Sequence, residues 1–549
     1  MSRWCGLMLM TLAACGGPAV ETAPATTDPT DPTDPTDSEP TDSEPAADPD
    51  LCDTDGLTRR PLQTEGAFGD ERRDLADDFT LSTPDGDFEF FEQWTGCETY
   101  VVLSDLMPTS PLDDTPMIDQ VDQLAELIEK SPRNVHYFFV SYRSDSDDFV
   151  AEVQANLDDA LAMVDDDLAE HLGPRLHVVD EPASNFDNWV QEALFHPGYG
   201  FAIDRFQRIR DLGSLGDVMQ YDVALGNIGY WPWRDSVAYA AHMPAYFNYE
   251  SDLDDRASDP AFTTLYLMYD EPVWLTGKDR DDVVFPDAAA MAGYDTMLID
   301  LQHHCDPALD EWGNCDAWDA VQSLWLCDED DVCTVEVARY ITTYHREGRW
   351  LADASQLLPY FREGGAHRLA LLGIRGGHYV TLRVLLGTKQ SDGLTPYAIV
   401  PMWTGGGFDA NYDANHPPMT VDVPSDMVKA TLQVTVTGHG MSEGDNCAEF
   451  CDHRHYFAIG GSTWAAEHPT IDNIVGCLEQ IPRGAVPNQY GTWWYNRSSW
   501  CPGMQVEPWV FDVTSELVAG SPATVSYTTN YGDVEGGTIE LRTFMVFWK

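Results

Sequence analysis

An acidic residue sits on a very short cysteine loop in the last third of the chain. Cys447 and Cys451 enclose only Ala448, Glu449 and Phe450. If the two sulfurs are bonded, the ring is small enough to hold Glu449 nearly rigid. A carboxylate on any surface loop is solvated without being held rigid. The need for contact with water therefore does not explain why Glu449 is fixed in a small ring. We therefore interpret Glu449 as a functional acid; the alternative is a loop acid with no role.

A second stretch, residues 488–504, combines aromatic plates, amides and Arg497 between turn residues. Aromatic faces stack on sugar rings, and amides hydrogen-bond to their hydroxyl groups. The composition therefore predicts a wall that binds a sugar. Trp500 in this stretch, together with Phe450 and Trp318, is a candidate stacking surface, and core packing is the alternative for each.

The two stretches together resemble the C-terminal half of the peptide-N-glycosidase F family, bacterial amidases that cut N-linked glycans from asparagine. The matching features are the Cys-Ala-Glu-aromatic-Cys loop, Gly476-Cys477, and the run Arg497-x-x-Trp-Cys-Pro-Gly-Met. Earlier in the chain, Cys315-Asp-Ala-Trp-Asp319 and the run 339–344 also match. The resemblance covers about residues 282–549.

This resemblance implies a mainly β fold with two side-by-side antiparallel jelly-roll sandwiches, 282–390 and 391–549. It implies hydrolysis of the amide bond between an N-glycan and asparagine, with glycoproteins or glycopeptides as substrates and no cofactor or metal. Asp319 takes the place of the principal catalytic aspartate, the candidate base, and a cap of a helix or turn is its alternative role. Arg497 takes the place of a substrate-binding arginine, with a surface salt bridge as its alternative.

The chemistry explains why two acids are needed. Attack of water on an amide requires a base, stabilisation of the oxyanion, and a proton for the leaving nitrogen. Asp319 and Glu449 facing each other in one cleft would push their pKa values apart and give one base and one proton donor. Two departures put the substrate in doubt: Ala320 stands where the family has arginine, and 368–375 lacks the family's third carboxylate.

Two other functions are open. Copper monooxygenases share the paired jelly-roll architecture, and the chain has side chains of the types that bind copper: His303, His304, Met441, His453 and His455. Adjacent surface histidines are the ordinary explanation for His303 and His304, and the sequence has no further spaced histidine for a two-site arrangement. A lipoprotein that binds glycans without cleaving them would also fit the missing third carboxylate.

The N-terminal end indicates export. Residues 1–15 contain Arg3, a short apolar run and Leu-Ala-Ala-Cys15, as in a lipoprotein signal peptide acylated on Cys15. An ordinary secretory signal, with Cys15 incidental, is the alternative. The net charge of −63 argues against nucleic acid and anionic membrane surfaces as partners. We expect an exported monomer on the bacterial outer membrane or cell surface, held only by its lipid, or otherwise secreted.

Three segments precede the sandwiches. Residues 16–51 are an acidic Pro, Thr and Asp linker that cannot bury apolar surface. Residues 52–220 resemble a thioredoxin-like α/β domain, with strands at 100–103 and 135–140. That domain is expected to be redox-inactive, because Ser104 follows the first strand where a redoxin has its reactive cysteine. Residues 221–281 are a connecting region without an assigned function.

Ten cysteines remain after Cys5 and Cys15 are set aside, an even number in an exported chain, so disulfides are expected. Proximity in sequence suggests five pairs. Three pairs agree with the family resemblance: Cys447–Cys451, Cys477–Cys501 and Cys305–Cys315. The other two, Cys327–Cys333 and Cys52–Cys97, are inferred from the cysteines that are left over.

Overall fold

The computed structural model describes fifteen stretches of the chain, and all statements below refer to them: 51–105, 117–142, 146–195, 200–217, 234–273, 278–306, 315–373, 378–390, 392–440, 447–468, 471, 473, 475–495, 497–530 and 536–549. The predicted signal peptide with Cys15, almost all of the linker, Met441 and the side chain of Cys447 lie outside them. No helix in the described stretches is both long and apolar enough to cross a bilayer.

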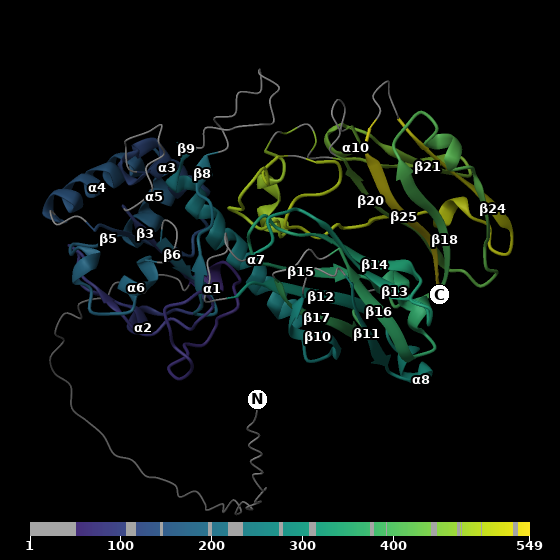
Figure 1. The fold of residues 1–549 in the computed structure, drawn as a ribbon, viewed down its shortest axis with the longest axis horizontal. Coiled ribbons are helices and arrows are strands. Elements are labelled where there is room, and N and C mark those ends of the chain that lie inside the picture. The colour runs from purple at the N-terminus through teal and green to yellow at the C-terminus, as the bar shows by residue number, and fades with distance from the viewer. Residues whose placement is uncertain are drawn as a thin grey trace, which may run out of the picture. The chain divides into compact units, whose positions relative to one another are not determined.

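The first part of the described chain forms an α/β unit, drawn in purple to blue-green in Figure 1. Its five-stranded mixed sheet has the order β5-β4-β3-β6-β7. Strands β3 to β5 run parallel, whereas β6 and β7 are antiparallel to their neighbours. The strands are Thr99–Ser104 (β3), Val135–Val140 (β4), Leu176–Val178 (β5), Gly200–Ile203 (β6) and Ile209–Asp211 (β7). The thioredoxin-like assignment and the absence of redox activity stay predictions.

Both faces of this sheet are covered by helices, because apolar side chains on alternate positions of β3 point to opposite sides. Val101 and Leu103 pack with α3 and α4, whereas Tyr100 and Val102 pack with α6 and the β2–α2 corner. The helices and short strands around the sheet are α1 (Leu51–Thr54), β1 (Thr80–Leu81), β2 (Phe88–Glu89), α2 (Phe90–Gln93), α3 (Val121–Lys130), α4 (Ser146–Leu161), α5 (Asp166–Leu172), α6 (Val190–Phe195), β8 (Gly216–Asp217), β9 (Arg234–Asp235) and α7 (His242–Ala257).

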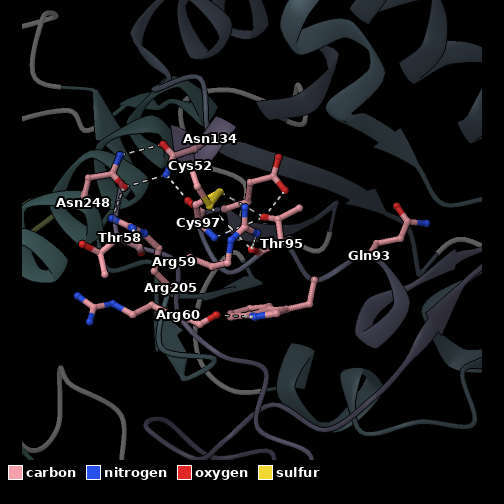
Figure 2. Close-up of a disulfide and its surroundings, with 12 residues drawn as sticks. Cys52, Thr58, Arg59, Arg60, Gln93, Thr95, Cys97, Asn134, Arg205 and Asn248 are labelled. Atoms are coloured by element: carbon pink, nitrogen blue, oxygen red, sulfur yellow. Dashed lines mark hydrogen bonds between the residues drawn. A yellow bond between two sulfur atoms is a disulfide. The ribbon is translucent and has the colours of Figure 1, made fainter. Parts of the chain in front are cut away.

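A disulfide between Cys52 and Cys97 ties the start of the described chain to the sheet (Figure 2). Next to it, the Asn134 side-chain amide donates to the Cys97 carbonyl at 2.6 Å and exchanges two hydrogen bonds of 2.8 Å with Asn248 on α7. The structure also has the bonds Cys305–Cys315, Cys327–Cys333 and Cys477–Cys501. These are four of the five expected pairs; the Cys447–Cys451 pair involves a side chain outside the described part.

The rest of the chain forms two jelly-roll sandwiches, as predicted, each made of two antiparallel four-stranded sheets (Figure 1). In each sandwich the first, eighth, third and sixth strands form one sheet, and the second, seventh, fourth and fifth form the other. Those of the first sandwich are β10 (Thr263–Val273), β11 (Lys278–Phe285), β12 (Thr296–His304), β13 (Val321–Cys327), β14 (Cys333–Ile341), β15 (Gly348–Asp353), β16 (Gly365–Leu372) and β17 (His378–Gly387), with helix α8 (Ala288–Met291) after β11.

The second sandwich has its own apolar core, centred on β20 and β25. Its elements are β18 (Pro396–Gly407), β19 (Met419–Asp422), β20 (Lys429–His439), α10 (Cys447–Phe450), β21 (His455–Ile459), β22 (Ser462–Ala466), β23 (Trp509–Asp512), β24 (Pro522–Thr529) and β25 (Thr538–Trp548). The first sandwich starts earlier than residue 282, because β10 pairs with β17 from Thr263 onward, inside the stretch expected to be a connecting region.

Candidate active site

The segment that carries Asp319 is held in place by Thr342, which follows β14. The Thr342 hydroxyl donates to the Trp318 carbonyl at 2.6 Å and accepts the Ala320 N–H at 2.8 Å, so it fixes the residues on both sides of Asp319. The Thr342 N–H donates to the Ala320 carbonyl at 3.0 Å. The Cys305–Cys315 disulfide anchors the start of the segment. Asp319 therefore sits on a constrained loop at the entry to β13.

Glu449 lies in the one-turn helix α10, which follows β20 in the second sandwich. Ala448 is buried in the apolar core of that sandwich, and this packing anchors the turn to the sandwich. The Glu449 backbone carbonyl accepts the Ser498 N–H at 2.8 Å, and its Oε2 accepts the Gly440 N–H at 3.0 Å. These bonds join the turn to the aromatic stretch 488–504 and to the end of β20.

The Arg497 guanidinium connects the two acids. Its Nη2 lies 3.1 Å from Asp319 Oδ2, and its Nε lies 3.3 Å from Glu449 Oε1. Nη1 donates to the carbonyls of Thr492 and Tyr495, and Nη2 also lies 3.2 Å from the hydroxyls of Thr492 and Tyr344. The side chain is only 2% exposed. The structure thus brings together the three residues that the sequence predicted for one site.

Burial and charge set the protonation of this group. Burial raises the pKa of Glu449 above its usual value, Asp319 adds to the rise, and Arg497 and the Gly440 N–H oppose it. Burial disfavours the charge of Arg497, but Tyr344, Asp319 and Glu449 outweigh burial and keep its pKa above the ordinary range. Glu449 therefore holds a proton more readily than a free carboxylate.

The three aromatic residues predicted to stack on sugars differ in exposure. Trp318, directly before Asp319, is 58% exposed and its ring is free to meet a ligand. Phe450 is half-buried and lies 5.6 Å from the Arg497 guanidinium. Trp500 is 5% exposed, with Arg497 4.8 Å above its ring and its Nε1–H donating to the Gly438 carbonyl at 2.8 Å. Trp500 therefore packs beneath Arg497, which is the alternative role named for it above.

Sequence reasoning did not single out Tyr344. Its hydroxyl accepts from Arg497 at 3.2 Å and is hydrogen-bonded to Asp319. Burial, reinforced by Asp319, raises the pKa of this phenol, so Tyr344 stays protonated and can donate to the carboxylate. The signal was present, since Tyr344 ends the run 339–344 that matches the family, but the run alone does not say which side chain faces Asp319.

The candidate copper ligands do not form one set. His303 and His304 lie on β12, where the His303 ring is buried against Trp350 and lies 4.8 Å from the His378 ring. His453 and His455 instead meet His468, in the second sandwich. Within the described residues the two pairs therefore belong to different sandwiches.

Gly438 on β20 leaves room for the Glu449 turn. A Cβ at this position would lie 1.4 Å from the Ala448 carbonyl oxygen, so the turn would have to move. We expect Gly438→Ala to lower catalytic turnover by about 10²-fold, because small misplacements of a catalytic group have effects of that size. Gly406→Ala on β18 is the matched control, since a Cβ there meets nothing within 4 Å. Equal turnover of both variants would contradict the prediction.

Comparison with known proteins connects this site to a family. Residues 408–544 match the family model described as Peptide-N-glycosidase F, C terminal. A curated relative, the peptide-N(4)-(N-acetyl-beta-D-glucosaminyl)asparagine amidase F of Elizabethkingia miricola, is 25% identical over 255 residues, which is 42% of this chain and 69% of the relative.

Solved structures were also found. A crystal structure of peptide-N(4)-(N-acetyl-beta-D-glucosaminyl)asparagine amidase is 18% identical, with 52% of this chain and 96% of that chain covered and a TM-score of 0.43. PNGF-II is 15% identical, with 54% and 67% covered and a TM-score of 0.39. The family model and the curated relative confirm the recognition of the peptide-N-glycosidase F family in the C-terminal part of this chain.

Proposed function

We propose that this protein is an amidase that hydrolyses the bond between an N-linked glycan and asparagine, releasing the glycan and leaving aspartate. The observation that carries the proposal is that Asp319 and Glu449, which come from different sandwiches, both form ion pairs with the buried guanidinium of Arg497. The curated relative is named for this activity. Exposed Trp318 beside Asp319 adds an aromatic face suited to a sugar ring.

In the proposed mechanism Asp319 is the base. Its side chain is 17% exposed, about twice the 9% of Glu449, so water reaches Asp319 more readily. Arg497 pairs with Oδ2 of the carboxylate and Tyr344 is hydrogen-bonded to the same group, so the base is held in place for the attacking water. Deprotonation of that water by Asp319 produces the hydroxide that attacks the asparagine side-chain amide.

Glu449 is the proton donor for the leaving glycosylamine nitrogen. Its raised pKa suits this role, since a general acid must hold its proton until the carbon–nitrogen bond breaks. Arg497 stays charged beneath both acids and acts as a positioning residue that keeps them in one site. We place Arg497 there rather than in direct contact with substrate, because its side chain is buried and its N–H groups are engaged.

The test is incubation of the pure protein with a denatured N-glycoprotein, followed by electrophoresis and mass analysis of the former glycosylation site. Conversion of asparagine to aspartate with release of the intact glycan supports the proposal. Binding of the glycoprotein without release supports the glycan-binding alternative instead. A reaction that requires dioxygen and a reductant would support a monooxygenase and overturn the amidase assignment.

The protonation of Glu449 predicts an alkaline limit to activity. Because its pKa is raised, the acid form persists above the usual range, and turnover should fall as the pH rises through that pKa. Glu449→Gln keeps an acceptor for the Gly440 N–H but has no proton to donate, so we expect a loss of about 10²-fold or more and no alkaline limb from this group. The pH profiles of kcat for both proteins check this. An alkaline limb that survives unchanged in the variant would rule out Glu449 as its source.

A further inference from the structure

Three buried histidines converge in the second sandwich, beside the Glu449 turn. They are His453, His455 at the start of β21, and His468 after β22, and one ring nitrogen of each lies within 4.8 Å of the other two. His453 Nδ1 is 3.0 Å from His455 Nε2 and 3.0 Å from His468 Nε2. Each side chain is at most 3% exposed.

The outer nitrogen of every ring has an oxygen partner. His453 Nε2 lies 2.8 Å from the Ala448 carbonyl, His455 Nδ1 lies 2.6 Å from the Tyr527 hydroxyl, and His468 Nδ1 contacts the Ser499 hydroxyl. A carbonyl only accepts, so His453 Nε2 carries the proton and His453 Nδ1 presents a bare lone pair to the centre. The two hydroxyl oxygens can accept in the same way, which would leave Nε2 of His455 and His468 bare as well.

This is the arrangement that metal-binding histidines adopt, in which the outer N–H is held by a second group and the inner nitrogen binds the ion. A network of hydrogen bonds alone explains the cluster less well, because His453 Nδ1 has one lone pair and two ring nitrogens at 3.0 Å. Nitrogens that share a tetrahedral zinc ion at its usual bond lengths lie about 3.3 Å apart. Two of the three pairs are already close to this spacing, and the third pair lies within 4.8 Å, so a shift of one ring by about 1.5 Å or less would place all three nitrogens around an ion.

We propose that His453, His455 and His468 bind a divalent transition-metal ion of the zinc type. Three neutral imidazoles are a ligand set that zinc accepts, with a fourth position for water. The Ala448 carbonyl that holds His453 belongs to the residue before Glu449, and Ser499 follows Ser498, whose N–H holds the Glu449 backbone. The ion would therefore stiffen the turn that carries Glu449.

A cavity of about 180 Å³ lies beside the cluster. It is lined by residues that include Glu467 and Ser499, the sequence neighbour and the hydrogen-bond partner of His468, but not by the three histidines themselves. Glu467 supplies a negative charge at this cavity, and Arg454 pairs with it at 3.3 Å. An ion in this cavity would therefore reach His468 only after the Ser499 side chain moves.

The test measures metal content and does not depend on turnover, so its failure is distinct from failure of the amidase proposal. Full-length protein purified without chelator is analysed by mass spectrometry of its metals, and we expect about one zinc ion per chain. His468→Gln should lose the ion, whereas His171→Gln in α5, outside the cluster, should keep it. A wild-type chain without metal, or a His468→Gln chain with the full complement, would overturn the proposal.

A second measurement covers the case in which His468→Gln does not fold. Wild-type protein stripped by a strong chelator is titrated with cobalt(II), whose visible absorption is intense in tetrahedral sites. We expect saturation at one equivalent, displacement by zinc, and a higher melting temperature with the ion than without it. Absence of both the absorption band and the thermal shift would overturn the proposal.

Discussion

Replacement of Asp319 by asparagine is expected to reduce glycan release by about 10²–10⁴-fold, the range that a positioned general base supplies. Asparagine has the same shape, and its amide oxygen can still accept from Arg497, so the segment held by Thr342 should keep its place. The melting temperature should therefore change little. Single-turnover release of glycan from a labelled glycopeptide measures the effect on the chemical step.

Asp281→Asn on β11 is a suitable control, because this exposed aspartate lies in the same sandwich and has no contact with the site. It should release glycan at the wild-type rate. An Asp319→Asn enzyme with wild-type turnover would exclude Asp319 as the base. A variant that loses activity together with its melting transition would instead assign Asp319 to structure.

The sequence predicted the sandwich strands where apolar residues form continuous or alternating runs. The stretches 296–301 and 434–436 fall inside β12 and β20, whose buried positions fit such runs. Strand β10 was missed because its pairing with β17 shifts register between Tyr266 and Met268 and again before Glu271. Tyr266 and Tyr269 are both exposed although they are three positions apart, because the irregular pairing lies between them. The strand therefore does not show the alternation of apolar and polar residues that marks a half-buried strand.

Most members of the site were predictable from the sequence, with Tyr344 as the exception, but their arrangement was not. Motif matches identified Asp319, Glu449 and Arg497, and the structure places all three in contact. Burial cannot be read from a motif, so the sequence did not show that Arg497 lies beneath the acids or that Trp500 lies beneath Arg497. His468 was missed for a related reason: it joins His453 and His455 only through the turn between β21 and β22.

The second large effect is expected from a buried ion pair that links the two sandwiches. Arg339 on β14 binds Glu336 with two bonds of 2.6 Å, and its Nη1 donates to the Thr437 hydroxyl on β20 and to the Glu540 carbonyl on β25. Both side chains are almost fully buried. Burial alone would raise the pKa of Glu336, but Arg339 outweighs it and keeps this pKa below its usual value, so the pair is ionised.

Arg339→Met should lower the free energy of unfolding by about 3–5 kcal/mol, because it leaves the Glu336 charge buried without its bidentate partner. Arg542, 3.5 Å from Glu336, offsets part of this cost at most. Denaturant unfolding followed by tryptophan fluorescence gives the change. The double variant Glu336→Leu/Arg339→Met removes both charges, so it should be more stable than Arg339→Met alone, and the difference measures the cost of the unpaired acid. If the single and double variants unfold alike, the loss comes from the hydrogen bonds to Thr437 and Glu540, and the joint between the sandwiches depends on them rather than on charge.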